Sequence, residues 1–166
     1  MFKKNINLFN YLIAICLPFL TLFSPDWLRI NGISPCWTVI WLLPFSIVNG
    51  PLRASIASIL IGLLMDSFTI GDVSYMPSLF VLSLIWGRYG RRNKNIDIFL
   101  NLGLMAILGT AFVGFSIWLQ KIFMYGVLRN NWFHAWALHA MISQVIITGL
   151  VAPLISSWLL LTYKKN

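Results

Sequence analysis

Asp66 is the residue of this 166-residue sequence whose type and position most invite a chemical role. It stands near the end of the apolar stretch ASIASILIGLLMDSFTIGD, residues 54–72. A carboxylate at the centre of a bilayer costs about 2.5–3.5 kcal/mol to insert, so such groups face the protein interior and pair with a neighbour or mark an ion or proton path. Two hypotheses follow: Asp66 is a functional acid, or it is a polar contact between packed helices.

The four acidic residues do not form an obvious catalytic pair. An intramembrane aspartic protease needs two carboxylates that face each other. Asp66 and Asp72 are six residues apart on one segment, and Asp72 is predicted to lie in a turn. Asp26 and Asp97 are predicted to lie on opposite sides of the membrane. The aspartates alone therefore do not predict a protease.

Histidine and cysteine give no further catalytic or metal pattern. His134 and His139 accompany no recognisable nucleophile motif, and Cys16 and Cys36 form no CxxC pair or Cys/His cluster. The sequence contains no P-loop, no dinucleotide fingerprint and no metal-ligand spacing. We therefore predict that the protein is not an enzyme and that it binds no cofactor and no metal.

A stripe of small residues leads to Asp66. Ala54, Ser58, Gly62 and Asp66 recur every four residues, which places them on one slowly drifting helix face. Small residues at this spacing let membrane helices approach closely. At 1.5 Å per residue, Asp66 lies about 20 Å along the helix from Arg53, in the predicted outer half of the membrane. We predict a helix-packing face that ends in a polar clasp.

The sixth apolar segment offers partners for this clasp. Small and polar residues recur there every four positions, at Ala140, Gln144, Thr148, Ala152 and Ser156. We expect Gln144 and Thr148 to be the polar partners. Interhelical hydrogen bonds of this kind contribute roughly 0.6 kcal/mol each. A purely structural role and a solute or proton site both remain open from the sequence.

The composition indicates that the predicted helices lie in a lipid bilayer and not in water. The chain is 59% hydrophobic and only 10% charged, whereas soluble domains carry about 25% charged residues. We predict a single all-α integral membrane domain over residues 1–166. A bilayer span needs about 20 apolar residues, and six segments approach this, at 6–23, 33–49, 53–70, 74–87, 98–120 and 135–161. The first follows two lysines as a signal peptide would, but no small-residue cleavage site follows it, so we expect a retained helix.

The net charge of +8 comes from twelve Lys/Arg and four acidic residues. If both termini are cytoplasmic, nine of these cations fall in inner segments, and the other three are Arg29, Lys121 and Arg129. The positive-inside rule thus explains the charge, and we predict no nucleic-acid partner. The strongest basic segment is WGRYGRRNKNID, with Arg88, Arg91, Arg92 and Lys94. It anchors the topology, or it also contacts anionic headgroups or a cytoplasmic protein.

The stretch from Pro35 to Arg91 resembles the core of the bacterial rod shape-determining MreD family, its cyanobacterial branch most of all. The resemblance lies in the Trp-rich PCWTVIWLLP, the Gly62 to Asp66 spacing, and the pieces LLP…GP and WGR.GR. The family often has a second glycine about eight residues after the aspartate, where this chain has Ser74. The turn after Asp66 therefore departs from the family pattern.

The resemblance implies a non-catalytic, multi-pass protein of the bacterial inner membrane that takes part in cell elongation. Its implied partners are membrane lipid, an MreC-like protein and, through it, MreB and the RodA/transpeptidase peptidoglycan synthases. The implied fold is a bundle of about six helices, similar to the substrate-binding components of energy-coupling-factor transporters. That similarity leaves an alternative function, the binding of a small vitamin-like solute for a membrane transporter.

Overall fold

The computed structural model describes residues 29, 32–68, 73–92, 99–125 and 135–164. These residues form helices and no β-strand, which confirms the all-helical class. The helices are α2 (Trp37–Asn49), α3 (Pro51–Phe68), α4 (Met76–Arg92), α5 (Phe99–Tyr125) and α6 (Ala135–Lys164). The predicted helix at 6–23 lies outside the described residues.

The first residues of two helices are determined by nearby prolines, and hydropathy alone does not predict them. α2 starts at Trp37 instead of residue 33, because Pro35 disfavours a helical conformation in the residue before it. α3 starts at Pro51, two residues earlier than predicted, since proline suits the first position of a helix. Only Gly50, with φ of +78°, separates α2 from α3. Its N–H donates to the Ser46 carbonyl at 3.1 Å, and its own carbonyl accepts the Ala54 N–H at 3.1 Å.

Three helices continue beyond their predicted ends. Predicted ends at 87, 120 and 161 become Arg92, Tyr125 and Lys164 in the structure. Hydropathy identifies the part of a helix that suits a bilayer, whereas backbone hydrogen bonding continues into the headgroup region. α3 is described as far as Phe68, and the last two residues of its predicted range, 69 and 70, lie outside the described residues.

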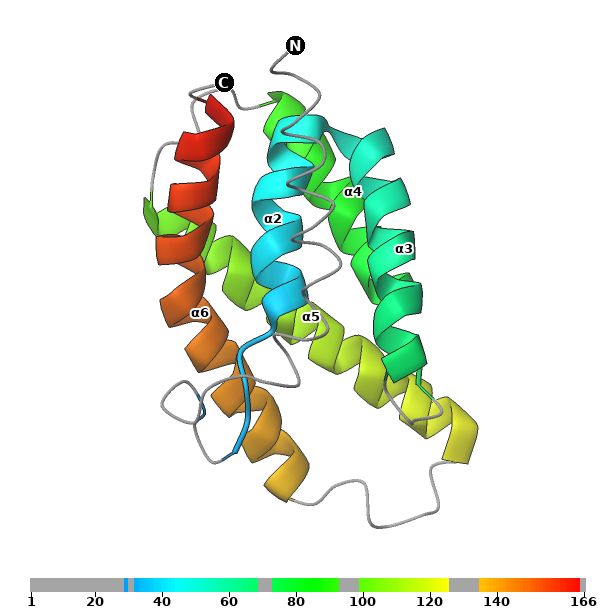
Figure 1. Cartoon of the computed structure of the whole chain (residues 1–166). Coiled ribbons are helices and arrows are strands. Elements are labelled where there is room, and N and C mark those ends of the chain that lie inside the picture. Colours follow the sequence, from blue (N-terminus) through cyan, green and yellow to red (C-terminus); the bar gives the residue numbers. More distant parts are fainter. Residues whose placement is uncertain (1–28, 30–31, 69–72, 93–98, 126–134, 165–166) are drawn as a thin grey trace.

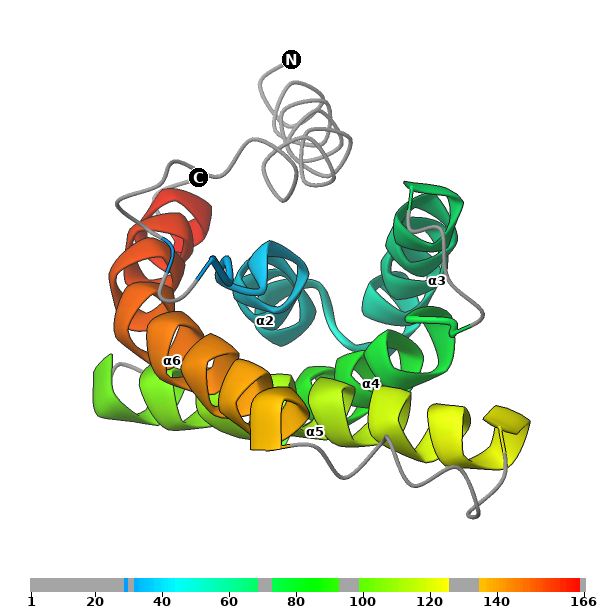
Figure 2. The same ribbon diagram turned by 90° about the horizontal axis from the view of Figure 1, so that it is seen from below.

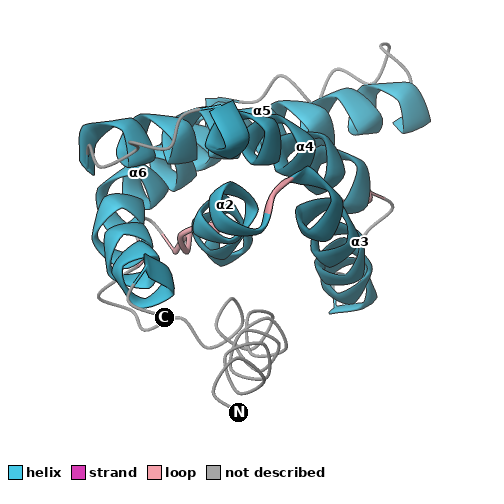
Figure 3. Cartoon of the chain, turned by 90° about the horizontal axis from the view of Figure 1, so that it is seen from above, coloured by secondary structure: helices cyan, strands magenta, loops and turns pink. Residues whose placement is uncertain are grey.

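α2 is the central helix of the bundle. α2, α4 and α6 run upward in Figure 1, and α3 and α5 run downward. Seen along the bundle, α6, α5, α4 and α3 follow one another around α2 (Figures 2 and 3). α2 packs against each of these four helices, while α3 packs most extensively on α4, and α5 on α6. α2 therefore lies between α3 and α6.

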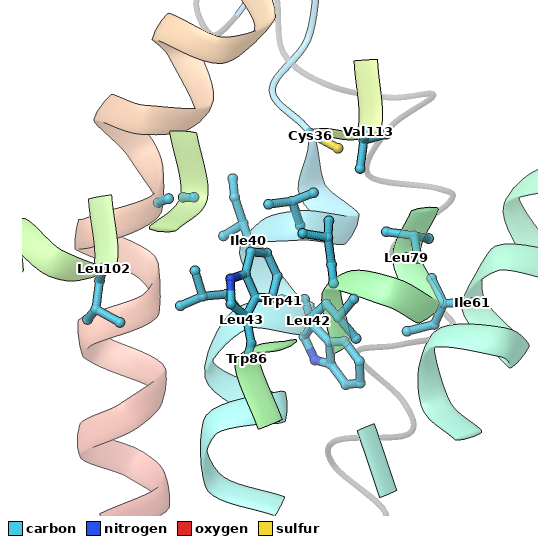
Figure 4. Packing of buried hydrophobic residues seen from close by; sticks show 14 residues of the cluster. Cys36, Ile40, Trp41, Leu42, Leu43, Ile61, Leu79, Trp86, Leu102 and Val113 are labelled. Carbon is cyan, nitrogen blue, oxygen red and sulfur yellow. The ribbon is translucent and has the colours of Figure 1, made fainter. Parts of the chain in front are cut away.

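The burial of α2 agrees with this central place. An unbroken run from Thr38 to Pro44 is buried, which covers every face of the helix. Its leucines and isoleucine meet Ile61 of α3 and Leu79 and Trp86 of α4 (Figure 4). Its sequence WTVIWLLPF is apolar on all sides, as expected for a helix that is enclosed by others.

Within the described part of the chain, three helices are long and apolar enough to cross a membrane. The qualifying segments are Pro51–Phe68, Asn101–Met124 and His139–Leu160. Their outward positions are large and apolar, among them Leu60, Leu108, Phe112, Leu150 and Leu154. Such exposed apolar surface suits lipid and not water. These helices support the prediction of a membrane protein, while α2, with 13 residues, is shorter than a typical span.

Candidate functional site around Asp66

Asp66 is half-buried near the end of α3 and is bonded to the segment that begins α4. Its Oδ1 accepts the Tyr75 N–H at 2.7 Å, and its Oδ2 accepts the Ser74 hydroxyl at 2.5 Å. Tyr75 directly precedes α4, where N–H groups lack partners within the helix and the helix dipole favours negative charge. Asp66 therefore caps the start of α4 from the neighbouring helix.

Ser74 extends this contact to a third helix. Its hydroxyl also accepts the Met76 N–H at 3.2 Å, which closes a short turn into α4. The side-chain amide of Gln120, on α5, pairs with both backbone groups of Ser74. The Ser74 N–H donates to Gln120 Oε1 at 3.0 Å, and Gln120 Nε2 donates to the Ser74 carbonyl at 2.9 Å. We name Asp66, Ser74, Tyr75 and Gln120 the Asp66 cluster.

Only part of this cluster is predictable from the sequence. The residue pattern indicates Asp66, but it indicates neither Gln120 nor the capping role of Ser74. The available signal for Gln120 is a long polar side chain in a mostly apolar helix, because such a side chain in a membrane helix usually bonds to a neighbouring segment. The structure also shows why Ser74 suits its place, since a glycine would lack the hydroxyl that bonds to Asp66.

The partners expected on the sixth segment lie elsewhere. α6 packs on α5 and α2, and α2 stands between it and α3 (Figure 3). Thr148 accepts the Cys36 N–H at 3.0 Å and donates to the Gln144 carbonyl at 2.6 Å. Thr148 thus holds the chain where it enters α2, and Asp66 takes its partners from the adjacent α4 segment instead.

The small-residue stripe of α3 faces α4. Ala54, Ser58 and Gly62 are buried, and the hydroxyls of Ser58 and Ser83 lie 3.0 Å apart across the two helices. A Cβ added at Gly62 would stand 2.7 Å from the Cα of Met76, so the backbones there are in direct contact. The stripe therefore packs against α4, and Asp66 bonds to the segment that begins the same helix.

A second close contact lies at the other end of α4. A Cβ added at Gly87 would stand 2.5 Å from the Cα of Pro51, and one at Gly90 would stand 2.7 Å from the Cα of Ile47. These glycines press the end of α4 against the turn between α2 and α3. The two sequence pieces LLP…GP and WGR.GR, separated by more than one helix in the chain, meet at this contact.

The basic residues gather around this contact. Arg91 lies over Gly50, where a Cβ would be 3.0 Å from its Nε and 3.3 Å from its Nη2. Arg53 comes from the first turn of α3, and Arg88 and Arg92 come from the end of α4. All four side chains are exposed, and we name them the arginine end. Lys94, predicted with them, lies outside the described residues.

The four arginines of the arginine end are separated along the bundle from Asp66, whereas Lys121 follows Gln120 of the Asp66 cluster in the chain. Asp66 is the sole acidic residue in the described part of the chain, and it lies in the last turn of α3, whereas Arg53 lies in the first turn, which meets the end of α4. Within those same residues, no three His, Cys, Asp or Glu side chains gather as metal ligands would. Both oxygens of Asp66 accept hydrogen bonds from Ser74 and Tyr75, which directly precede α4, and this is the chemistry of a cap.

Two tryptophans of α2 are a feature that the sequence did not predict. The indole N–H groups of Trp37 and Trp41, one turn apart, are buried and have no hydrogen-bond partner among the residues that the structure describes. Trp41 also stacks on Phe45, with ring centroids 4.6 Å apart. An unsatisfied buried donor costs about 1–3 kcal/mol, so this pair stands out in an otherwise apolar helix.

Comparison of the chain with models of protein families, with curated proteins and with solved structures gave no match in any of the three. Function must therefore be argued from the site itself and from the sequence features that it brings together.

Proposed function

We propose that this protein is a non-catalytic membrane scaffold of the cell-elongation machinery, similar in role to MreD. The observation that carries the proposal is the environment of Asp66. Both of its carboxylate oxygens bind the start of α4, so the one intramembrane acid of the described chain serves helix packing.

The resemblance to MreD supports the proposal because its residues coincide with packing contacts. It spans α2, α3 and α4, and Gly62, Gly87 and Pro51 all lie at points where these helices touch. Residues that set helix contacts are what a scaffold with a defined shape requires. We further propose about six membrane crossings in the bacterial inner membrane, in a fold similar to the energy-coupling-factor substrate-binding components.

The distribution of charge favours one orientation. The arginine end gathers at one end of the bundle, and cytoplasmic ends of membrane proteins are rich in Lys and Arg. We propose that this end, with both termini, faces the cytoplasm. The opposite end, with the Asp66 cluster, then faces the periplasm, and an MreC-like protein, MreB and the RodA/transpeptidase synthases are the proposed partners.

The test is purification of the tagged full chain from native membranes with identification of the proteins that accompany it. We expect an MreC-like protein among them, and we expect depletion of the chain to round or widen the cells. Cells of unchanged shape, together with the absence of such a partner, would contradict the proposal. Asp66→Asn provides a second test. If Asp66 only supports helix packing, the amount of co-purified partner should fall only as far as the amount of folded protein falls.

A second candidate function, the binding of a small vitamin-like solute, is favoured by Trp37 and Trp41. Two buried donors without partners are suited to a ligand that carries hydrogen-bond acceptors. Thermal denaturation of the purified chain across a panel of water-soluble vitamins tests this. A stabilising vitamin whose effect disappears in Trp41→Phe would support solute binding, and no stabilisation by any of them would remove it.

A further inference from the structure

The arginine end consists of four guanidinium groups with no acidic neighbour among the described residues. Arg53, Arg88, Arg91 and Arg92 are all exposed, and Asp66 lies at the far end of the bundle. Arginine presents a planar fork of donors that matches the oxygens of phosphate, whereas lysine acts as a point charge. The positive-inside rule requires cations at this end, but it does not require arginine in particular.

The cluster is also held in place by the backbone. Gly87 and Gly90 bring the end of α4 into direct contact with the turn that begins α3. This contact brings Arg53 to the same end of the bundle as Arg88 and Arg91. Arg91 itself lies against Gly50, whose missing side chain leaves the room that the guanidinium occupies. A group that is already positioned loses less entropy when it binds a ligand.

An apolar stripe runs from this cluster along the outside of α3. Ile56, Leu60 and Leu63 are exposed, and their spacing places them on the same face as Arg53. α3 is apolar enough to cross a membrane, and Arg53 lies in its first turn, so the arginine sits where the hydrocarbon region ends. A cation stands at the headgroup level, and apolar side chains continue below it.

α4 repeats the same pattern. Val81 and Ile85 are exposed, and at helical spacing they lie on the same face as Arg88. Neighbouring helices therefore present two outer apolar stripes, and both stripes end in an arginine of the same cluster. This combination suits a ligand that joins a phosphate to acyl chains. A free phosphate or an acidic peptide would use the arginines alone.

We propose that the arginine end binds the phosphate of an anionic phospholipid, with the acyl chains along the outer stripes of α3 and α4. The phosphate accepts hydrogen bonds from the guanidinium groups of Arg88, Arg91 and Arg53. The proposal rests on these contacts and does not depend on the cell-elongation role. It predicts preference for an anionic over a zwitterionic lipid, and loss of that preference when the forked donors are removed.

The experiment uses the purified full chain in a neutral detergent. Lipid binding is measured by native mass spectrometry with phosphatidylglycerol and with phosphatidylcholine of the same acyl chains. For Arg88→Ala/Arg91→Ala we expect phosphatidylglycerol affinity to fall about 10- to 30-fold, because each basic residue near an anionic surface accounts for about a 5-fold change. Glycerol 3-phosphate, which lacks acyl chains, is added as a competitor, and we expect it to compete weakly.

Two matched variants separate a site from general charge. Arg88→Lys/Arg91→Lys keeps the charge and removes the forks, and we expect it to lose several-fold in affinity. Lys164→Ala/Lys165→Ala removes two cations elsewhere in the sequence, and we expect near-normal binding. Equal losses in the two alanine variants would overturn the proposal, and so would full binding by the lysine variant. If glycerol 3-phosphate competes as well as phosphatidylglycerol itself, the acyl chains contribute nothing, and the site binds free phosphate instead of a lipid.

Discussion

At the scale of single residues, Asp66 shows how a charge is accommodated in an apolar helix. The carboxylate receives one hydrogen bond from a hydroxyl and one from a backbone N–H, and both donors belong to the segment that starts the next helix. Hydrogen bonds to a charged group contribute about 1.5–3 kcal/mol, more than a neutral pair. The carboxylate therefore stabilises the junction of α3 and α4.

Asp66→Ala is expected to lower the stability of the folded chain by about 1–3 kcal/mol, because it leaves the Tyr75 N–H without its acceptor. Thermal denaturation in detergent measures this. Asp66→Asn should lose less, since the amide keeps one acceptor oxygen. Ser67→Ala is the control, because its exposed hydroxyl bonds only within α3, to the Leu63 carbonyl. Wild-type stability in Asp66→Ala would show that the cap is unimportant.

Gln120 allows a test of whether it is energetically coupled to Asp66. Its amide and the Asp66 carboxylate both fix Ser74, one through the backbone and one through the hydroxyl. We expect Asp66→Ala and Gln120→Ala to be non-additive in a double-mutant cycle, with a coupling of about 0.5–3 kcal/mol. Additive losses, measured by the same denaturation assay, would mean that Ser74 does not link the two residues.

At the scale of elements, the closest helix contacts occur at glycines. Gly87 of α4 touches the backbone at Pro51, so an added methyl group meets atoms that cannot rotate away. Gly103 of α5 offers the matched comparison, because its nearest neighbour would stand 3.6 Å from an added Cβ. The two positions differ in packing but share a helical backbone.

Gly87→Ala is expected to destabilise the chain by about 1–3 kcal/mol through overpacking. Gly103→Ala is expected to be neutral or stabilising, since alanine is favoured over glycine in helices by up to about 1 kcal/mol. The measurement is the midpoint of thermal unfolding of each variant in one detergent. If both variants shift the midpoint in the same direction and by the same amount, the close backbone contact at Pro51 does not determine the effect of an added methyl group at Gly87.

Element types and rough positions were predictable here, and element partners were not. Apolar runs gave the helical class, and small-residue spacing gave the buried face of α3. Which helix meets that face depends on the place of α2 in the bundle. The apolar sequence of α2 indicates that other helices enclose it, but it does not indicate which helices lie on each side. For this reason the residue spacing predicts partners for Asp66 on α6 and does not indicate Ser74, which is the partner in the structure. The ends of α4 and α5 were also missed, because hydropathy ends before hydrogen bonding does.

At the scale of the whole molecule, the arginine end and the Asp66 cluster define two different ends. Four exposed arginines gather at one end of the bundle, and the described acidic residue lies at the other. Exposed apolar residues lie between them on the outside of α3, α4, α5 and α6. This arrangement predicts a single orientation in the membrane.

Cysteine labelling tests that orientation. In a Cys16→Ser/Cys36→Ala background, a cysteine at Arg92 should react with a membrane-impermeant maleimide only from the cytoplasmic side. A cysteine at Phe123, which is 81% exposed near the far end of α5, should react only from the other side. Sealed vesicles of both orientations give the comparison. Reaction of both cysteines from one side would rule out the opposite placement of the two ends.

The single residue between α2 and α3 has a consequence for biosynthesis. α2 has 13 residues, about 20 Å of helix, against a hydrocarbon thickness of about 30 Å. It is too short to be held in a bilayer alone, and Gly50 gives it no loop that would let it enter separately. We therefore expect the translocon to admit α2 and α3 together as one hairpin, once synthesis has passed Phe68.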